Sequence, residues 1–519
     1  MILAQHQTVD AVTLLRRAAR TYPDRIAFQW ESGQLRYRDL MARVDRVAAA
    51  FAAAGVMPGD RVAFMLRNGP TFLEVYLATL HLGAICVPLN FRLKAAEVAY
   101  QVNDADPRLL IADEETAGEA SAASLPGSCR LVVDGRGKGT DNLAHLVGAA
   151  PDHVPATAID LSAPASLLYT SGTTGLPKGV IRSHFSLAYL IPLRAATMGF
   201  GPDSVHLAPT PMFNAGGHEF MMLETLASGG RVIVRRRFDV PEVIDLVARE
   251  RVTHAYFVPT MGIRLMDAIE AAAPDWRSLR MWMSAAAPLP EALRDRIRAA
   301  LPATGLWISY GITEVGAVTF LRPTDVARKP GHCVGPPMMG VAVRCVDDQG
   351  HECPPGGAGE VVCRSPEAMT GYWRNPKATA DTIRHGWVRT GDVGTFDDER
   401  YLYLLDRIKD IVISGGDNVY VSEVENRLAS APQVLEVAVI GTPHPEWGEA
   451  VVAVVVPRAG VRRPDLGNDL IAFARDGLAH YKCPKRVVFA EELPRSEYGK
   501  VLKTELRRRY RDLFTGAHP

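Results

Sequence analysis

The sequence predicts an α/β fold, with a large N-terminal body of layered sheets and helices and a small, mobile α+β domain at the C-terminus. Short apolar segments alternate with amphipathic ones along much of the chain, and this order favours largely parallel sheets with helices on their faces. After residue 341 the pattern changes to short strands with tight turns. A chain of 519 residues is also too long for one hydrophobic core, so we expect more than one domain.

Two spacings of apolar residues alternate along the body, one typical of helices and the other typical of strands. Leu40, Val44 and Phe51 fall on one face of a predicted helix, and Gly55 is placed to end it. A strand at 62–66, a helix at 72–82 and a strand at 84–87 follow. The same rhythm predicts strands at 231–234, 255–258, 281–284 and 307–309, and helices at 241–250 and 291–301.

The later part of the chain predicts antiparallel strands and then a separate domain. Strands are expected at 341–346 and 360–363, with a hairpin tip at 396–401. A compact run follows, with helices at 422–429 and 469–478 and strands at 436–440 and 450–456. We therefore place the body at 1–406, a hinge at 407–409 and a cap domain at 410–519, a normal size for one domain.

Composition excludes several classes of protein. Lys+Arg and Asp+Glu both number 58, so no overall charge favours nucleic acid. No apolar run approaches the roughly 18–20 residues of a membrane span, and Arg16 and Arg17 are not followed by the apolar stretch of a secretory signal. Seven cysteines without a C-x-x-C pair argue against zinc and redox sites. We expect reduced thiols and a cytoplasmic protein without integral membrane contact.

The most informative segment is a Gly-, Ser- and Thr-rich loop that follows the buried strand predicted at 165–168. Glycines let the backbone approach a ligand closely, so consecutive N–H groups can line one concavity. Hydroxyls and a lysine add donors and positive charge, which suits a polyphosphate; a plain surface turn is the alternative. No Walker-type P-loop, G-x-G-x-x-G or G-x-S-x-G occurs in the chain. The candidate phosphate-binding residues are Thr170, Ser171, Gly172, Thr173, Thr174, Gly175 and Lys178.

A second constellation lies at 309–314, directly after the strand predicted at 307–309. Ligand groups in α/β folds lie after such strand ends. Glu314 can hold Mg²⁺, which prefers oxygen ligands, while Thr313 can donate to a phosphate and Tyr310 offers a flat face for adenine. A helix cap is the alternative for a Thr–Glu pair taken alone.

These segments resemble motifs of the adenylate-forming superfamily, which comprises acyl-CoA synthetases, carrier-loading adenylation domains and firefly-type luciferases. The loop matches [ST]-S-G-[ST]-[ST]-G-x-P-K-G without a gap, and residues 310–314 match Y-G-x-T-E. At least five motifs occur in the family's order, over nearly the whole chain.

The resemblance implies roles for further residues. Ala285, Ala286 and Ala287 would line the adenine beside Tyr310 and Gly311, with alanines where the family usually has glycine. Asp392 would accept from the ribose hydroxyls, and Arg407 would hold the ribose from the other side. In the hinge and cap domain, the expected roles are a pivot at Lys409, a thiol tunnel at Gly415 and Gly416, and the catalytic lysine of the first half-reaction at Lys500, which acts with Thr313 and Glu314.

The activity implied is that of an AMP-forming carboxylate–CoA ligase. A carboxylic acid would attack Mg·ATP to give an acyl-adenylate and pyrophosphate, and coenzyme A would then displace AMP. Alternatives are a ligase that loads the phosphopantetheine of a carrier protein, a luciferase-like oxidation and a non-catalytic nucleotide-binding protein. A homodimer is the family's common assembly.

The acyl pocket is where the chain departs from the family. A P-x-F-H segment is usual there, whereas this chain has Asn214 in place of the histidine. The sequence leaves open whether His218 replaces it or is simply a core or surface histidine. Gly311 lies where acetyl-CoA synthetases have a tryptophan, which argues against acetate and favours a medium-chain or aryl acid. The acyl-pocket candidates are Phe213, Asn214, His218, Phe257, Gly311 and Val315.

Overall fold

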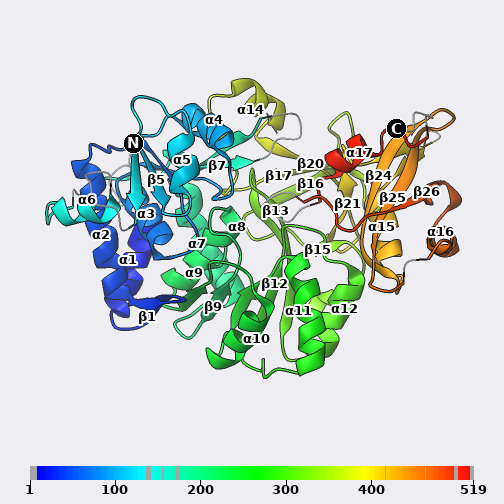
Figure 1. Ribbon diagram of the computed structural model, residues 1–519, viewed down its shortest axis with the longest axis horizontal. Helices are drawn as coiled ribbons and strands as arrows, with labels where there is room; N and C mark the ends of the chain where they lie inside the picture. Colours follow the sequence, from blue (N-terminus) through cyan, green and yellow to red (C-terminus); the bar gives the residue numbers. More distant parts are fainter. Residues whose placement is uncertain are drawn as a thin grey trace.

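Two large sheets, parallel in their interiors, form the body of the protein (Figure 1). The computed structural model describes residues 9–135, 142–154, 157–170, 176–414, 417–461, 463–495 and 501–514. Within these residues, the first sheet has eight strands, in the spatial order β14 (Gly316–Leu321), β13 (Gly305–Ile312), β12 (Met281–Ser284), β11 (His254–Tyr256), β9 (Val205–Ala208), β10 (Arg231–Val234), β1 (Ile26–Trp30) and β2 (Gly33–Arg36).

The second sheet has the same design, a parallel interior with an antiparallel edge. Its spatial order is β18 (Gly371–Tyr372), β8 (Lys178–Ser183), β7 (Pro164–Thr170), β4 (Ile85–Pro88), β3 (Arg61–Met65), β5 (Leu109–Asp113) and β6 (Arg130–Asp134). In both sheets the antiparallel hairpin at one edge holds a sequence motif: β7–β8 flanks the phosphate loop, and β13–β14 flanks Glu314.

Helices cover the two sheets, as the alternating pattern predicted. The helices of the body are α1 (Ala11–Thr21), α2 (Tyr37–Ala53), α3 (Pro70–His81), α4 (Ala95–Ala105), α5 (Ala117–Ala122), α6 (Leu143–Ala149), α7 (His184–Met198), α8 (Ala215–His218), α9 (Met222–Ala227), α10 (Val240–Arg249), α11 (Pro259–Ala272), α12 (Glu291–Ala300), α13 (Pro323–Val326) and α14 (Pro376–Thr382). In α2 the predicted apolar face is buried, with Leu40, Val44 and Phe51 at 1% exposed or less. The helix ends before Gly55, whose φ of +85° suits glycine.

A third sheet is antiparallel and connects the body to the C-terminal part of the chain. It contains β15 (Cys333–Gly335), β21 (Leu402–Arg407), β20 (Trp387–Phe396), β17 (Gly359–Arg364), β16 (Ala342–Val346) and β19 (Ile383–Arg384). The chain leaves this sheet at Arg407 and enters a fourth one at Val412, across the segment predicted as the hinge.

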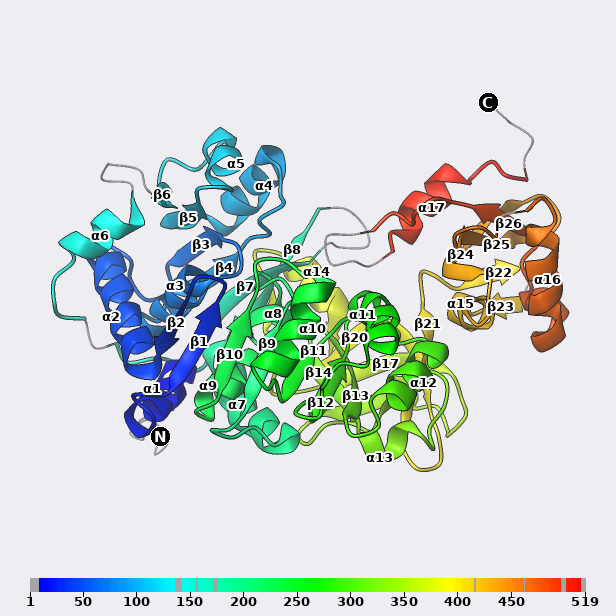
Figure 2. The same cartoon turned by 60° about the horizontal axis from the view of Figure 1, so that its bottom comes forward.

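The C-terminal elements stand to one side of the body (Figure 2). They are β22 (Val412–Ser414), β23 (Asp417–Val419), β24 (Val434–His444), β25 (Gly448–Pro457), β26 (Arg486–Phe489), α15 (Val421–Ala429), α16 (Leu466–Gly477) and α17 (Lys503–Arg509). A separate hydrophobic cluster, which includes Val424, Val439 and Leu470, forms their core. The predicted α/β body with a smaller α+β domain is thus confirmed.

One prediction needs correction. The strand expected at 307–309 runs from Gly305 to Ile312, so Tyr310 and Gly311 lie inside it rather than after it. The reason is its antiparallel pairing with β14, in which Ile312 lies opposite Gly316; the short apolar run could not reveal that pairing. Among the described residues, no helix is both long and apolar enough to cross a membrane.

Candidate active site

The base of the phosphate loop is held by helix α4. Thr170 and Lys178 are the last paired residues of the β7–β8 hairpin, while Ser171, Gly172, Thr173, Thr174 and Gly175 lie outside the described residues. Before the loop, the Tyr169 hydroxyl donates to Oδ2 of Asp104 at 2.6 Å; after it, the Tyr100 hydroxyl donates to the Pro177 carbonyl at 2.9 Å. Tyr100 and Asp104 are four residues apart in α4 and therefore share a face. Sequence patterns did not reveal this support, because it joins distant segments.

Lys178 and Glu314 both contact Tyr372, an aromatic residue that the sequence analysis did not single out. The Lys178 Nζ atom lies 5.2 Å from the centre of the Tyr372 ring, within cation–π range. The hydroxyl of the same tyrosine donates to Oε1 of Glu314 at 2.9 Å. Burial and then the Glu314 carboxylate raise the pKa of Tyr372 above its usual value. Tyr372 thus brings the phosphate loop's lysine and the predicted magnesium ligand to one place, with the half-buried Thr313 in the same turn as Glu314.

The residues predicted to hold the ribose also come together. The Tyr310 hydroxyl donates to Oδ2 of Asp392 at 2.7 Å, and Nε of Arg407 lies 2.9 Å from Oδ1. Asp392 is 5% exposed and lies opposite Arg407 in the β20–β21 ladder. A carboxylate offers about four lone-pair sites, so two sites remain for further donors. The ring of Tyr310 is 7% exposed, and burial and then Asp392 raise the pKa of its hydroxyl.

The three alanines follow the carboxyl end of β12, beside β13 in the same sheet. Ala286 takes a φ of +72°, in the left-handed region that costs an L-residue roughly 1–2 kcal/mol. Ala286 therefore adopts a glycine-like conformation although it carries a side chain.

Four of the six acyl-pocket candidates are buried, namely Phe213, His218, Phe257 and Val315. Phe213 packs edge-on against Phe91, with ring centroids 5.4 Å apart, and Asn214 caps α8 through its backbone without a side-chain capping bond. Phe257 and Val315 are fully buried, and Phe257 packs against Trp282. In this arrangement the last two belong to the core and offer no surface to an acid.

His218 occupies a buried position. Its Nδ1 atom lies 2.6 Å from the Met212 carbonyl oxygen and 2.8 Å from that of Asn214, so Nδ1 carries the hydrogen and donates. The ring is 1% exposed and packs against Tyr76. Burial lowers the pKa of His218. This is the core histidine that the sequence left as an alternative.

The interpretation of Gly311 needs correction. A Cβ atom added there would lie 2.2 Å from the carbonyl oxygen of Gly316, because the two strands approach closely at a register shift between Tyr310 and Gly311. The neighbouring main chain therefore explains the missing side chain. The missing side chain at Gly311 is therefore not by itself evidence for a long acid pocket.

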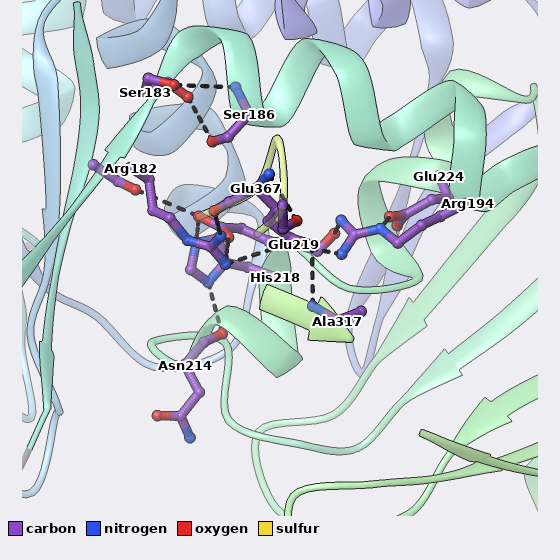
Figure 3. A network of polar contacts seen from close by, with 12 residues as sticks. Arg182, Ser183, Ser186, Arg194, Asn214, His218, Glu219, Glu224, Ala317 and Glu367 are labelled. Atoms are coloured by element: carbon purple, nitrogen blue, oxygen red, sulfur yellow. Dashed lines mark hydrogen bonds and ion pairs between the residues drawn. The ribbon is translucent and has the colours of Figure 1, made fainter. Parts of the chain in front are cut away.

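The body also contains a buried network of charged side chains (Figure 3). Arg182 and Arg194 contact three carboxylates, and all five side chains are 3% exposed or less. The carboxylates are Glu219, Glu224 and Glu367. Burial, opposed by Arg194, raises the pKa of Glu224 to about 7. The network joins β8 and α7 to the segment that leads into β18.

The hinge segment lies between a contact to the body, Arg407 with Asp392, and a contact to the C-terminal elements. Burial lowers the pKa of Lys409, and the next residue, Asp410, pairs with Arg507 at 2.8 Å. Gly415, Gly416 and Lys500 lie outside the described residues. Arg495 and Val501, which flank the segment containing Lys500, form an antiparallel bridge.

A hollow of about 260 Å³ lies elsewhere, where β9 and β10 begin. Arg25 and Arg231 line it, and both are already paired, with Asp203 and Glu250 respectively. It is at the amino ends of the parallel strands, the edge opposite Ala285–Ala287, and none of the predicted site residues lines it. No group of three or more His, Cys, Asp or Glu side chains in the described part of the chain could hold a metal by itself.

The layered body, the smaller C-terminal domain and the convergence of phosphate- and ribose-type residues define an adenylate-forming enzyme. A model of the AMP-binding enzyme family matches residues 15–373, and a model of the AMP-binding enzyme C-terminal domain matches residues 423–500. The chain therefore belongs to the AMP-binding enzyme family.

Relatives and solved structures agree with this assignment. A feruloyl-CoA synthase from Amycolatopsis sp is 40% identical over 502 residues, which cover 95% of this chain and 98% of that protein. An indoleacetate–CoA ligase from Aromatoleum aromaticum is 34% identical over 496 residues, covering 95% and 96%. The crystal structure of ATP-bound MatB from Rhodopseudomonas palustris superposes with a TM-score of 0.88 at 32% identity, covering 97% and 100%.

Proposed function

We propose that the protein is an AMP-forming carboxylate–CoA ligase that acts on an aryl acid. The observation that carries this is the 40% identity to a feruloyl-CoA synthase over almost the full length of both chains. The second relative is named for another aromatic acid. Phe91, which is half-buried, packs against Phe213 beside Asn214 and adds aromatic surface next to the predicted pocket.

In the first half-reaction, a carboxylate oxygen of the acid attacks the α-phosphorus of ATP, and the bond to the β-phosphate oxygen breaks to release pyrophosphate. Residues 170–175 and Lys178 hold the phosphates, and Asp392 with Arg407 holds the ribose. The Ala285–Ala287 backbone and Tyr310 border the adenine. Lys500 stabilises the charge that develops on the α-phosphate.

Glu314 suits a magnesium ion. Mg²⁺ is usually bound through one or two carboxylates plus substrate phosphates. One oxygen of Glu314 accepts from Tyr372, which orients the carboxylate and leaves its other oxygen for a cation. When bound, the ion neutralises phosphate charge.

In the second half-reaction, the sulfur of coenzyme A attacks the carbonyl carbon of the acyl-adenylate. The bond to the phosphate oxygen breaks, AMP leaves, and the thiol proton passes to solvent. We propose that the cap domain, residues 410–519, rotates about Lys409 between the two steps, replacing Lys500 by Gly415 and Gly416 at the site. The seven unpaired cysteines support a reducing cytoplasm as its location.

A pyrophosphate-release screen tests this function. Ferulate, indoleacetate, a medium-chain fatty acid, malonate and acetate are each supplied with Mg·ATP, with and without coenzyme A, and products are identified by mass. We expect aryl acids to give the fastest release and a CoA thioester. The enzyme could instead form the adenylate but no CoA thioester, and transfer the acyl group to a phosphopantetheinylated carrier protein. That result would show that the carrier protein, and not coenzyme A, is the acceptor. Lack of pyrophosphate release with every acid would overturn the proposal.

A further inference from the structure

Three segments far apart in the sequence build the phosphate side of the site. Lys178 begins β8, Glu314 lies in the turn between β13 and β14, and Tyr372 ends β18. Their relative placement decides whether Lys178 and Glu314 can face the same polyphosphate. One buried carboxylate, that of Glu367, contacts β8 and β14 from the segment that leads into β18 (Figure 3).

Glu367 uses both carboxylate oxygens and its own backbone. Oε1 accepts from Arg182 of β8 at 3.2 Å and from Arg194 of α7 at 3.1 Å. Oε2 accepts from the backbone N–H of Ala317 in β14 at 3.0 Å. The Glu367 carbonyl accepts a further bond from Arg182 at 2.5 Å. A single side chain therefore ties β14 of the first sheet to β8 of the second.

The residues that follow Glu367 continue this connection along the backbone. The Met369 N–H donates to the Glu314 carbonyl, and the Trp373 N–H donates to the Gly179 carbonyl, both at 2.8 Å. Tyr372, between these two bonds, pairs with Val180 and reaches Lys178 and Glu314 with its side chain. The position of Tyr372 thus depends on where Glu367 anchors the start of the segment.

We propose that Glu367 is a positioning residue that sets the distance between Lys178 and Glu314 for adenylation. This inference rests on the proposed function. Buried ion pairs contribute little net stability, because desolvation opposes the Coulomb attraction, so the role of Glu367 lies in the geometry that it fixes. Errors of about 1 Å in the placement of reacting groups can cost about 100-fold in rate.

The chain offers a matched control in the same network. Glu224 is fully buried and also pairs with Arg194, at 2.5 Å. Among the described residues it pairs with that arginine alone, so it ties neither β8 nor β14. In Glu367→Gln, the side-chain amide has one oxygen that accepts and one NH₂ group that donates. If the oxygen accepts from Ala317, the NH₂ group faces the arginines, which are themselves donors and cannot bond to it. One of the two connections is therefore lost, whereas Glu224→Gln removes the same charge without that loss.

The test compares Glu367→Gln, Glu367→Asp and Glu224→Gln with the unmodified chain. Adenylation is followed by ATP–pyrophosphate exchange, the second step by thioester formation from supplied acyl-adenylate, and folding by thermal melting. We expect Glu367→Gln to raise KM for Mg·ATP and lower adenylation kcat/KM by about 10–100-fold. KM for the acid and the second step should change little. Glu224→Gln should leave the ratio of the two half-reactions unchanged.

Parallel losses in Glu367→Gln and Glu224→Gln, or equal losses in both half-reactions, would overturn the positioning role. If Glu367→Gln does not fold, Glu367→Asp tests the positioning role instead. It keeps the charge, but its side chain is one methylene too short to reach both Arg182 and Ala317. It should show the same selective loss, smaller in size. An unmodified protein without pyrophosphate exchange would instead refute the proposed function, so the two failures are distinguishable.

Discussion

The hydroxyl of Tyr310 donates a 2.7 Å hydrogen bond to Asp392, from β13 of the eight-stranded sheet to β20 of the antiparallel sheet. Arg407 holds the other oxygen of the same carboxylate at 2.9 Å. The carboxylate that we predict to hold the ribose is therefore oriented by residues on two sheets. Arg407 ends β21 and is the first residue of the predicted hinge, so the orientation of Asp392 is linked to the segment about which we propose that the cap domain moves.

Replacing Tyr310 by Phe should weaken nucleotide binding while leaving the fold intact. The change removes one donor and leaves a buried carboxylate oxygen unpaired, which costs about 1–3 kcal/mol. We expect KM for Mg·ATP to rise by about tenfold, equivalent to 1.4 kcal/mol, with KM for the acid unchanged. Steady-state kinetics measure both values. Tyr403→Phe is the control, because its hydroxyl makes a longer 3.4 Å bond to Asp397; an equal effect there would contradict a specific role for Tyr310.

Replacing Ala286 by Gly should stabilise the protein. The φ of +72° costs alanine roughly 1–2 kcal/mol, while glycine loses about 0.4–1 kcal/mol through the greater freedom of its unfolded chain. The net expectation is a gain of up to about 1.6 kcal/mol, measured by denaturant unfolding. Ala287→Gly, at the next exposed residue and without a positive φ, should lose stability instead. A loss in both variants would show that Ala286 is not strained.

The layered fold and several site residues could be predicted from the sequence because they depend on local patterns. The apolar face of α2 and the glycine after it are encoded within one segment, and Tyr310, Asp392 and Arg407 lie in short motifs. The contacts of Tyr372 and Glu367 depend on the pairing of β18 with β8 and of β13 with β14. No spacing in the chain encodes such long-range pairings. For the same reason, the sequence could not show that His218 is buried or that the main chain lies against Gly311.

Stability should fall as the pH rises from about 4.5 to about 7, in part through Glu224. Burial raises its pKa from 4.5 to about 7, so in this window the folded state binds more protons than the unfolded state, and raising the pH favours unfolding. Glu224→Gln mimics the protonated form and should flatten this part of the curve. Melting temperatures at pH 5, 6, 7 and 8 measure the effect. A slope that is unchanged in the variant would show that Glu224 does not titrate there.

Lys500 should serve the first half-reaction alone. Its ammonium stabilises the charge that the α-phosphate gains during attack, and removing one such group costs about 10²–10³-fold in rate. In the second step the thiol attacks the carbonyl carbon, so no fifth bond forms at the α-phosphorus and the charge of that transition state does not arise. Lys500→Ala should therefore lose ATP–pyrophosphate exchange by that factor, yet form thioester from supplied acyl-adenylate and coenzyme A within about threefold of the unmodified rate. Lys500→Arg keeps the charge but changes its shape, and should recover only part of the exchange. If Lys500→Ala slows both half-reactions equally, the lysine is needed for more than adenylation, and the alternation of Lys500 with Gly415 at one site must be abandoned.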